Sequence, residues 1–160
     1  MLLFTLCVLA CFASCQKEAS LNKGTSIQQQ VDDQAQLTGG RPIEVMLTGA
    51  AERPGPGDPD GTGTATFALN QGQGTIRYDI TVANITLPAV GAHIHIADVN
   101  NPGPIVVHLT APDETGHSSG EVSVDPALIK AIRQNPENYY INVHTLPFYG
   151  AGAVRAQLSK

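Results

Sequence analysis

The chain has 160 residues, a formal net charge of −5, and 42% hydrophobic against 14% charged residues. This length and composition predict one folded domain with a leader, and they exclude a disordered chain. The 9 lysines and arginines of this acidic chain argue against nucleic acid as a partner, because a phosphate backbone requires a basic surface.

The leader is an apolar run over residues 1–14. It is too short to cross a bilayer as a helix and is typical of the hydrophobic part of a secretory signal. The sequence FASC at residues 12–15 resembles a bacterial lipobox, in which a cysteine is lipidated and becomes the mature N-terminus. We therefore expect a signal peptide over 1–14, lipidation of Cys15, and an anchored protein of the cell envelope, on the outer membrane or the periplasmic face. Cys11 ends a second candidate motif, and a plain secretory signal is the alternative.

Cysteine use limits the chemistry of the rest of the chain. All three cysteines, Cys7, Cys11 and Cys15, lie in the leader. Neither a disulfide nor a thiolate ligand is therefore expected in the folded part. Residues 15–41 are polar and are interpreted as a flexible tether to a membrane, with an extra strand or helix on the domain as the alternative. The domain is predicted over residues 42–160.

Short alternating segments separated by glycine and proline predict an all-β domain. The first strand is expected over 43–48, and the strands 62–69 and 75–82 form a hairpin around the glycine-rich turn 70–74. A helix is predicted over 127–133, because Asp125 can cap it and Pro126 suits its first turn. Five more strands are expected, at 91–96, 105–109, 120–124, 139–145 and 153–158. About eight strands and one short helix predict a Greek-key sandwich or barrel.

The strand with the sequence GAHIHIAD at residues 91–98 carries two histidines on one face. Successive side chains of a strand point to opposite faces, so His93 and His95 lie side by side, about 7 Å apart along the strand. The strand predicted over 139–145 adds His144 on its polar face. A His-x-His pair and one distant histidine predict a metal site of three nitrogen ligands.

Imidazole nitrogens without a thiolate fit Cu(II) or Zn(II). Three nitrogens leave room for a fourth ligand, and the candidates are Asp98, His108 and His117, the last on a loop expected over 111–120. The alternative is that His93, His95 and His144 are partly buried polar residues that form hydrogen bonds at one end of a barrel.

Three segments in this order resemble the CHRD domain, a module named after its repeats in chordin that also occurs singly in bacterial secreted proteins. They are GAHIH at residues 91–95, NVHT at 142–145 and AVRAQL at 153–158, and TGTAT at 62–66 fits the same pattern. The resemblance covers residues 43–158 and implies an immunoglobulin-like β-barrel. Ala153 departs from the family pattern, which often has Glu at this position.

The CHRD resemblance also implies a distant similarity to copper–zinc superoxide dismutase, which carries a His-x-His strand and later ligand histidines. This similarity favours copper over zinc at the three histidines. The dismutase disulfide is not expected, and the loop lacks the spacing of the zinc ligands, so a two-metal enzyme is not expected. We therefore expect an extracytoplasmic lipoprotein that binds copper rather than an enzyme. A non-metal interaction or adhesion module and a mononuclear copper enzyme with dismutase-like activity are the alternatives.

Arg155 is expected to be structural. Its predicted strand consists otherwise of small and apolar residues. We expect its charge to pair with Glu44, Glu52 or Asp79.

Overall fold

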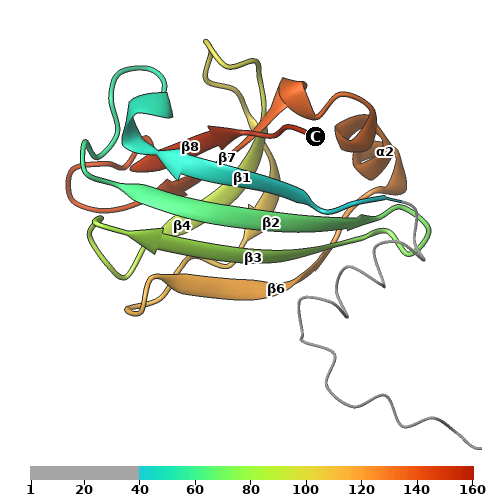
Figure 1. Cartoon of the computed structure of the whole chain (residues 1–160), viewed down its shortest axis with the longest axis horizontal. Helices are drawn as coiled ribbons and strands as arrows, with labels where there is room; N and C mark the ends of the chain where they lie inside the picture. The colour runs from blue at the N-terminus through green and yellow to red at the C-terminus, as the bar shows by residue number, and fades with distance from the viewer. Residues whose placement is uncertain (1–39) are drawn as a thin grey trace, which may run out of the picture.

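The computed structural model describes residues 40–160 as a barrel-like all-β domain (Figure 1). Eight antiparallel strands form one nearly closed sheet in the order β5-β4-β7-β8-β1-β2-β3-β6. Within this range, no helix has the length and apolar character needed to cross a membrane. The predicted signal peptide, Cys15 and nearly all of the predicted tether lie outside the described residues.

The strands are β1 (Ile43–Thr48), β2 (Thr62–Asn70), β3 (Thr75–Ala83), β4 (Gly91–Ile96), β5 (Ile105–Leu109), β6 (His117–Ser123), β7 (Tyr139–His144) and β8 (Val154–Gln157). The helix α2 (Pro126–Gln134) follows β6, and two short 3₁₀ helices are η1 (Gly49–Ala51) and η2 (Pro136–Asn138). The side chain of Asp125 caps α2 by accepting a hydrogen bond from the backbone N–H of Ala127 at 2.8 Å. The prediction of about eight strands and one short helix is therefore confirmed for the described residues.

One predicted boundary is wrong in a way that concerns a candidate ligand. Strand β6 begins at His117 and not at Gly120, and its first four residues pair with residues 78–81 of β3. The sequence HSSG has no apolar alternation that could indicate a strand, and the ladder to β3 provides its backbone hydrogen bonds. His117 therefore lies on a strand, and not on the loop where the sequence placed it.

The hydrophobic core fills the interior of the barrel. Alternate residues of β1 and β3 are buried, as expected for strands with one face inside and one face in solvent. The helix α2 adds Ile129 and Ile132, both fully buried, at one end of the barrel. The fully buried side chains contributed by the strands include Phe67, Ile76, Ile80, Ala92, Ile94, Ile141, Val143 and Val154.

The connection between β5 and β6 joins the two ends of the sheet. The Tyr78 hydroxyl on β3 accepts a hydrogen bond from Thr110 N at 3.0 Å and donates one to Thr110 Oγ1 at 2.9 Å. The backbone N–H of Ala89 donates to the Pro112 carbonyl at 2.9 Å. These contacts hold the two edge strands near each other, so that the sheet is nearly closed.

Strand β7 is buried on both of its faces, although only one faces the core. Two loops, residues 97–104 and 145–153, cover the other face. The Gln157 side chain donates to the Ala97 carbonyl at 2.7 Å, and Gly103 N donates to the Tyr140 hydroxyl at 3.2 Å. The Asn142 side chain contacts the Ala151 carbonyl at 3.5 Å. A polar layer is thus enclosed between the outside of the barrel and these two loops.

Candidate metal centre

The structure brings His93, His95 and His144 together on the outer face of β4 and β7. One ring nitrogen from each histidine lies within 4.8 Å of the others. The ring centroid of His93 is 4.9 Å from that of His144 and 5.7 Å from that of His95. The strand register explains this convergence, because Gly91 stands opposite His144 and His93 is therefore its diagonal neighbour.

Hydrogen bonds from two covering loops determine which ring nitrogens face the cluster. Nδ1 of His95 lies 2.8 Å from the Gly103 carbonyl oxygen, and Nδ1 of His144 lies 3.0 Å from that of Gly150. A carbonyl can only accept, so each Nδ1 carries the proton and each Nε2 keeps its lone pair. A partner on the second ring nitrogen is the usual way in which a metal-binding histidine is oriented.

One ring nitrogen of each of the three histidines is buried and has no hydrogen-bond partner. These nitrogens are Nε2 of His95, Nε2 of His144 and Nδ1 of His93. Buried polar atoms nearly always have a partner, so three such nitrogens in one cluster require an explanation. A bound cation that accepts three lone pairs would satisfy all of them.

Gly91 provides the space for this cluster. A Cβ atom at this position would lie 2.9 Å from Cε1 of His93 and 3.5 Å from Cδ2 of His144. The first distance is shorter than real Cβ contacts, so a larger residue would push the His93 ring from its place. The glycine that precedes the His-x-His motif is therefore part of the site.

All three imidazoles are held in their neutral form. Burial lowers the pKa of His93 from 6.5 to about 4, and the neighbouring His144, His108 and His95 add to this shift. Burial also lowers the pKa of His95 and of His144, although the carbonyl partners of their Nδ1–H groups oppose this effect. Neutral imidazole is the form that binds metal ions, so the cluster is ready to bind at pH 7.

The lowered pKa of His93 predicts how the metal-free chain responds to acid. An unfolded chain takes up this proton near pH 6.5, whereas the folded chain resists it until about pH 4. The unfolded state therefore binds more protons between these values, and the free energy of unfolding is expected to fall as the pH falls through this window. Urea unfolding at pH 7.5 and at pH 4.5, with a chelator present, measures the change.

The control for this experiment is His93→Gln, which cannot take up the proton. Glu52 acts in the opposite direction, because burial raises the pKa of its carboxyl above 4.5 and so favours the folded chain in acid. The comparison removes this contribution, since both chains contain Glu52. If the free energy of unfolding fell equally between pH 7.5 and pH 4.5 in His93→Gln and in the parent chain, the assignment to His93 would be wrong.

A stack of side chains supports His95 from the side. Its ring lies against the Tyr140 ring, with centroids 4.7 Å apart and planes at 9°. The guanidinium carbon of Arg155 lies 3.5 Å from the centroid of the same Tyr140 ring. Since two groups this close cannot share one face of a ring, Tyr140 lies between His95 and Arg155. Arg155 thus positions a histidine of the cluster through Tyr140.

Arg155 is 1% exposed, and its hydrogen bonds differ from those expected. It donates to the carbonyl oxygens of Asp98 and Asn101 at 2.9 and 3.1 Å, and to Oε1 of Gln157 at 3.2 Å. Of the three carboxylates predicted as partners, Glu52 is the one whose charge acts on Arg155. The predicted pairing with a carboxylate is therefore confined to the charge of Glu52, while hydrogen bonds and the aromatic stack hold the guanidinium, which fixes the 97–104 loop.

The three candidates for a fourth ligand differ in position. His108 stands opposite His93 in the register of β4 and β5, and their ring centroids are 4.9 Å apart. The exposed Asp98 carboxylate accepts hydrogen bonds from Asn100 N at 2.8 Å and from Asn101 Nδ2 at 3.0 Å. His117 lies on β6, and its ring contacts Asp79 of β3. Of these candidates, the structure places only His108 against the cluster.

His117 has a partner of its own. Its Nε2 lies 3.1 Å from Oδ2 of Asp79 on β3. Both side chains are about half exposed, so the pair is a surface contact. His117 therefore provides a control position outside the cluster.

Sequence reasoning missed several groups that hold the histidines. Tyr140 and Asn142 have the same strand parity as His144, so alternation alone could have placed them on the polar face of β7. The carbonyl groups of Gly103 and Gly150 carry no such signal. Their role depends on where two loops fold back over the sheet, which the alternation of side chains does not report.

Comparison with known proteins identifies the family of this chain. A family model for the CHRD domain matches residues 43–158. No curated protein and no solved structure matches the chain. The matched range contains all eight strands, the helix α2 and the three clustered histidines, and the chain therefore belongs to the CHRD domain family.

Proposed function

We propose that this chain binds one copper ion through His93, His95 and His144. The observation that carries the proposal is that each of the three histidines has a buried ring nitrogen without a partner, in a cluster where one ring nitrogen of each lies within 4.8 Å of the others. Sites made of imidazole nitrogens bind Cu(II) more strongly than Zn(II). Copper is therefore the preferred metal, and zinc is the competitor that the experiment must include.

The residues around the cluster have separate roles in this proposal. The carbonyl groups of Gly103 and Gly150 fix the tautomers of His95 and His144, so that each Nε2 faces the ion. The burial of His95 and of His144 keeps their rings neutral. His108 is the side chain best placed to provide a fourth nitrogen, since it adjoins His93. The proposed role is metal binding or handling, and a dismutase assay on the copper-loaded chain tests the catalytic alternative.

The proposal includes a location outside the cytoplasm. The apolar run at 1–14 and the FASC sequence that ends at Cys15 support export and lipidation. A copper site on such a protein would meet the metal in the cell envelope, and the lipid would keep it at a membrane surface.

A Cu(II) titration followed by electron paramagnetic resonance tests the metal site. The chain used should carry serine at its three cysteines, so that no thiolate in the leader competes for copper. We expect one tightly bound ion with hyperfine structure from imidazole nitrogens, which excess zinc displaces only at a large molar surplus. Binding no tighter than that of the urea-denatured chain would overturn the proposal. The histidines would then be structural, in agreement with the interaction-module alternative.

A further inference from the structure

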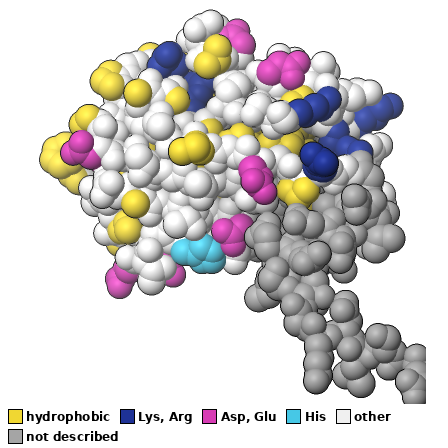
Figure 2. Space-filling model, in the orientation of Figure 1, with side chains coloured by type: hydrophobic (Ala, Val, Ile, Leu, Met, Phe, Trp, Pro, Cys, Tyr) yellow, Lys and Arg dark blue, Asp and Glu magenta, His cyan; other side chains and the backbone are white. Residues whose placement is uncertain are grey.

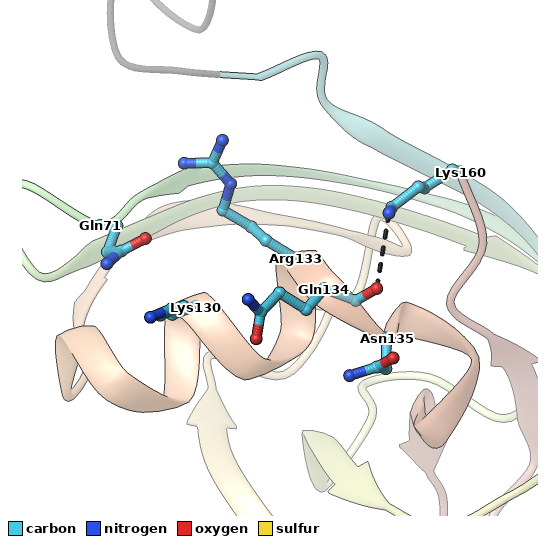
Figure 3. A pocket seen from close by; sticks show the side chains of 6 residues that line it. All are labelled: Gln71, Lys130, Arg133, Gln134, Asn135 and Lys160. Carbon is cyan, nitrogen blue, oxygen red and sulfur yellow. Dashed lines mark hydrogen bonds between the residues drawn. The ribbon is translucent and has the colours of Figure 1, made fainter.

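A second feature of the domain lies away from the histidines, at the end of the barrel that α2 covers. Four cationic side chains line two adjoining hollows there, and we call Arg41, Lys130, Arg133 and Lys160 the basic face. Arg133 and Lys160 line both hollows, and Figure 3 shows them with Lys130 around α2. These cations form one surface on α2, on the residues before β1 and on the residues after β8.

The basic face contrasts with the charge of the rest of the domain. Residues 40–160 contain seven lysines and arginines against eleven aspartates and glutamates, and four of the seven cations belong to this face. The other three are engaged elsewhere: Arg53 donates to two carbonyls, Arg77 pairs with Glu121, and Arg155 is buried. Among the residues lining the two hollows, Glu44 has the only carboxylate side chain. Figure 2 shows Lys and Arg side chains gathered at this end.

The preceding chain joins the domain at this same end. The described part starts at Gly40, directly before Arg41, and Gly40 also lines the second hollow. The sequence before it contains the apolar run at 1–14, which we interpret as leading to a lipid anchor at Cys15. An anchor on this segment would hold the basic face, rather than another part of the domain, closest to the membrane.

We propose that the basic face docks on the phosphate headgroups of an anionic lipid surface. Lysine and arginine side chains near such a surface attract it through its negative potential, and their contributions add. The rest of the domain is acidic and is repelled, so the attraction also selects an orientation. The cations are spread over two open hollows rather than directed at one point, which suits a layer of headgroups better than a single phosphate ion.

This inference does not depend on metal binding, but it predicts how the domain and its histidine cluster are oriented at the lipid surface. The turn 145–153, which contacts His144, lies at the opposite end of the barrel from α2 (Figure 1). A domain docked through its basic face would therefore direct this turn away from the lipid. The end of the domain that carries this turn and His144 would then face the aqueous side.

Vesicle sedimentation of the full chain tests the proposal. Partition onto vesicles of phosphatidylcholine is compared with partition onto vesicles that contain phosphatidylglycerol, so that any insertion of the apolar run contributes to both. We expect a larger fraction of the chain to sediment with the vesicles that contain phosphatidylglycerol, and we expect added salt to reverse this gain. Replacing two exposed cations, Lys130→Gln with Lys160→Gln, should lower partition onto the anionic vesicles by about 25-fold, at roughly fivefold for each cation.

The matched control is Arg77→Gln, which removes an exposed cation on β3, outside the basic face. It should change partition by less than about twofold, because the Debye length of about 10 Å limits its reach. An equal loss in Arg77→Gln, or equal partition onto the two kinds of vesicle, would overturn the proposal. Displacement by inorganic phosphate at constant ionic strength would also overturn it, since the face would then be a site for free phosphate. Circular dichroism verifies that the double variant is folded.

Discussion

Replacing His93 by alanine is expected to weaken Cu(II) binding by at least about 100-fold, because loss of an outer-shell partner alone costs 10–100-fold. The His93 ring centroid lies 5.7 Å from that of His95 and 4.9 Å from that of His144, and His93 contributes one of three nitrogens to the cluster. The two remaining rings cannot replace it, because the carbonyls of Gly103 and Gly150 fix their orientation. Isothermal titration at pH 7 with a competing chelator measures the affinity, and electron paramagnetic resonance counts the bound nitrogens.

His117→Ala is the control for this prediction. It removes an exposed histidine from β6 whose ring contacts Asp79 and not the cluster, so copper affinity should stay within about twofold of the parent chain. His108→Ala should give an intermediate loss if that ring is the fourth ligand, and no loss if water or another group takes this position. Unchanged affinity in His93→Ala, with the fold intact, would exclude the proposed site.

Replacing Arg155 by alanine is expected to destabilise the domain by roughly 3–5 kcal/mol, the range found when a large buried side chain or one member of a buried polar set is removed. The guanidinium is 1% exposed and donates to the carbonyls of Asp98 and Asn101. Alanine would leave the Asn101 carbonyl without this donor and the Asp98 carbonyl with only the Asn101 N–H at 3.3 Å, and it would open a cavity beside Tyr140. Urea unfolding of the metal-free chain measures the loss.

The comparison for Arg155→Ala is Arg77→Ala, at an arginine whose ion pair with Glu121 is about half exposed. An exposed pair contributes at most about 1 kcal/mol, so the two arginines should differ several-fold in their effect on stability. Arg155→Ala should also weaken copper binding, through the stack onto His95, by roughly 10–100-fold. A stability loss no greater than that of Arg77→Ala would contradict the structural role.

The order of the elements follows from the sequence because most strands are half-buried. Alternation identifies β1 and β3 without ambiguity, since one side chain in two enters the core. The helix α2 has its own signals in Asp125 and Pro126. Strand β6 lacks apolar alternation over residues 117–120, so the sequence predicts a strand that is too short. Tertiary pairing with β3 creates this first part of β6.

The candidate metal site could be predicted in part, because side chains alternate between the two faces of a strand. Parity places His93 and His95 on one face and His144 on the polar face of its strand. The pairing of β4 with β7, which joins residues about fifty positions apart, has no signal in local sequence, and the register of Gly91 with His144 shows it in the structure. The burial of the cluster comes from loops that cover it, and neither their path nor the place of Arg155 under Tyr140 has a signature in local sequence.

The two carbonyl partners of the histidines have different consequences for how this protein can change over evolution. A side chain at residue 103 would collide with the Ile96 backbone, so this loop must keep its glycine. A Cβ atom at residue 150 would meet only Cδ2 of Leu146, at the ordinary contact distance of 3.7 Å. Because the hydrogen bond to His144 comes from the backbone, the 145–153 turn can accept substitutions at residue 150 without losing that bond. Sequence drift should therefore be freer at position 150 than at position 103.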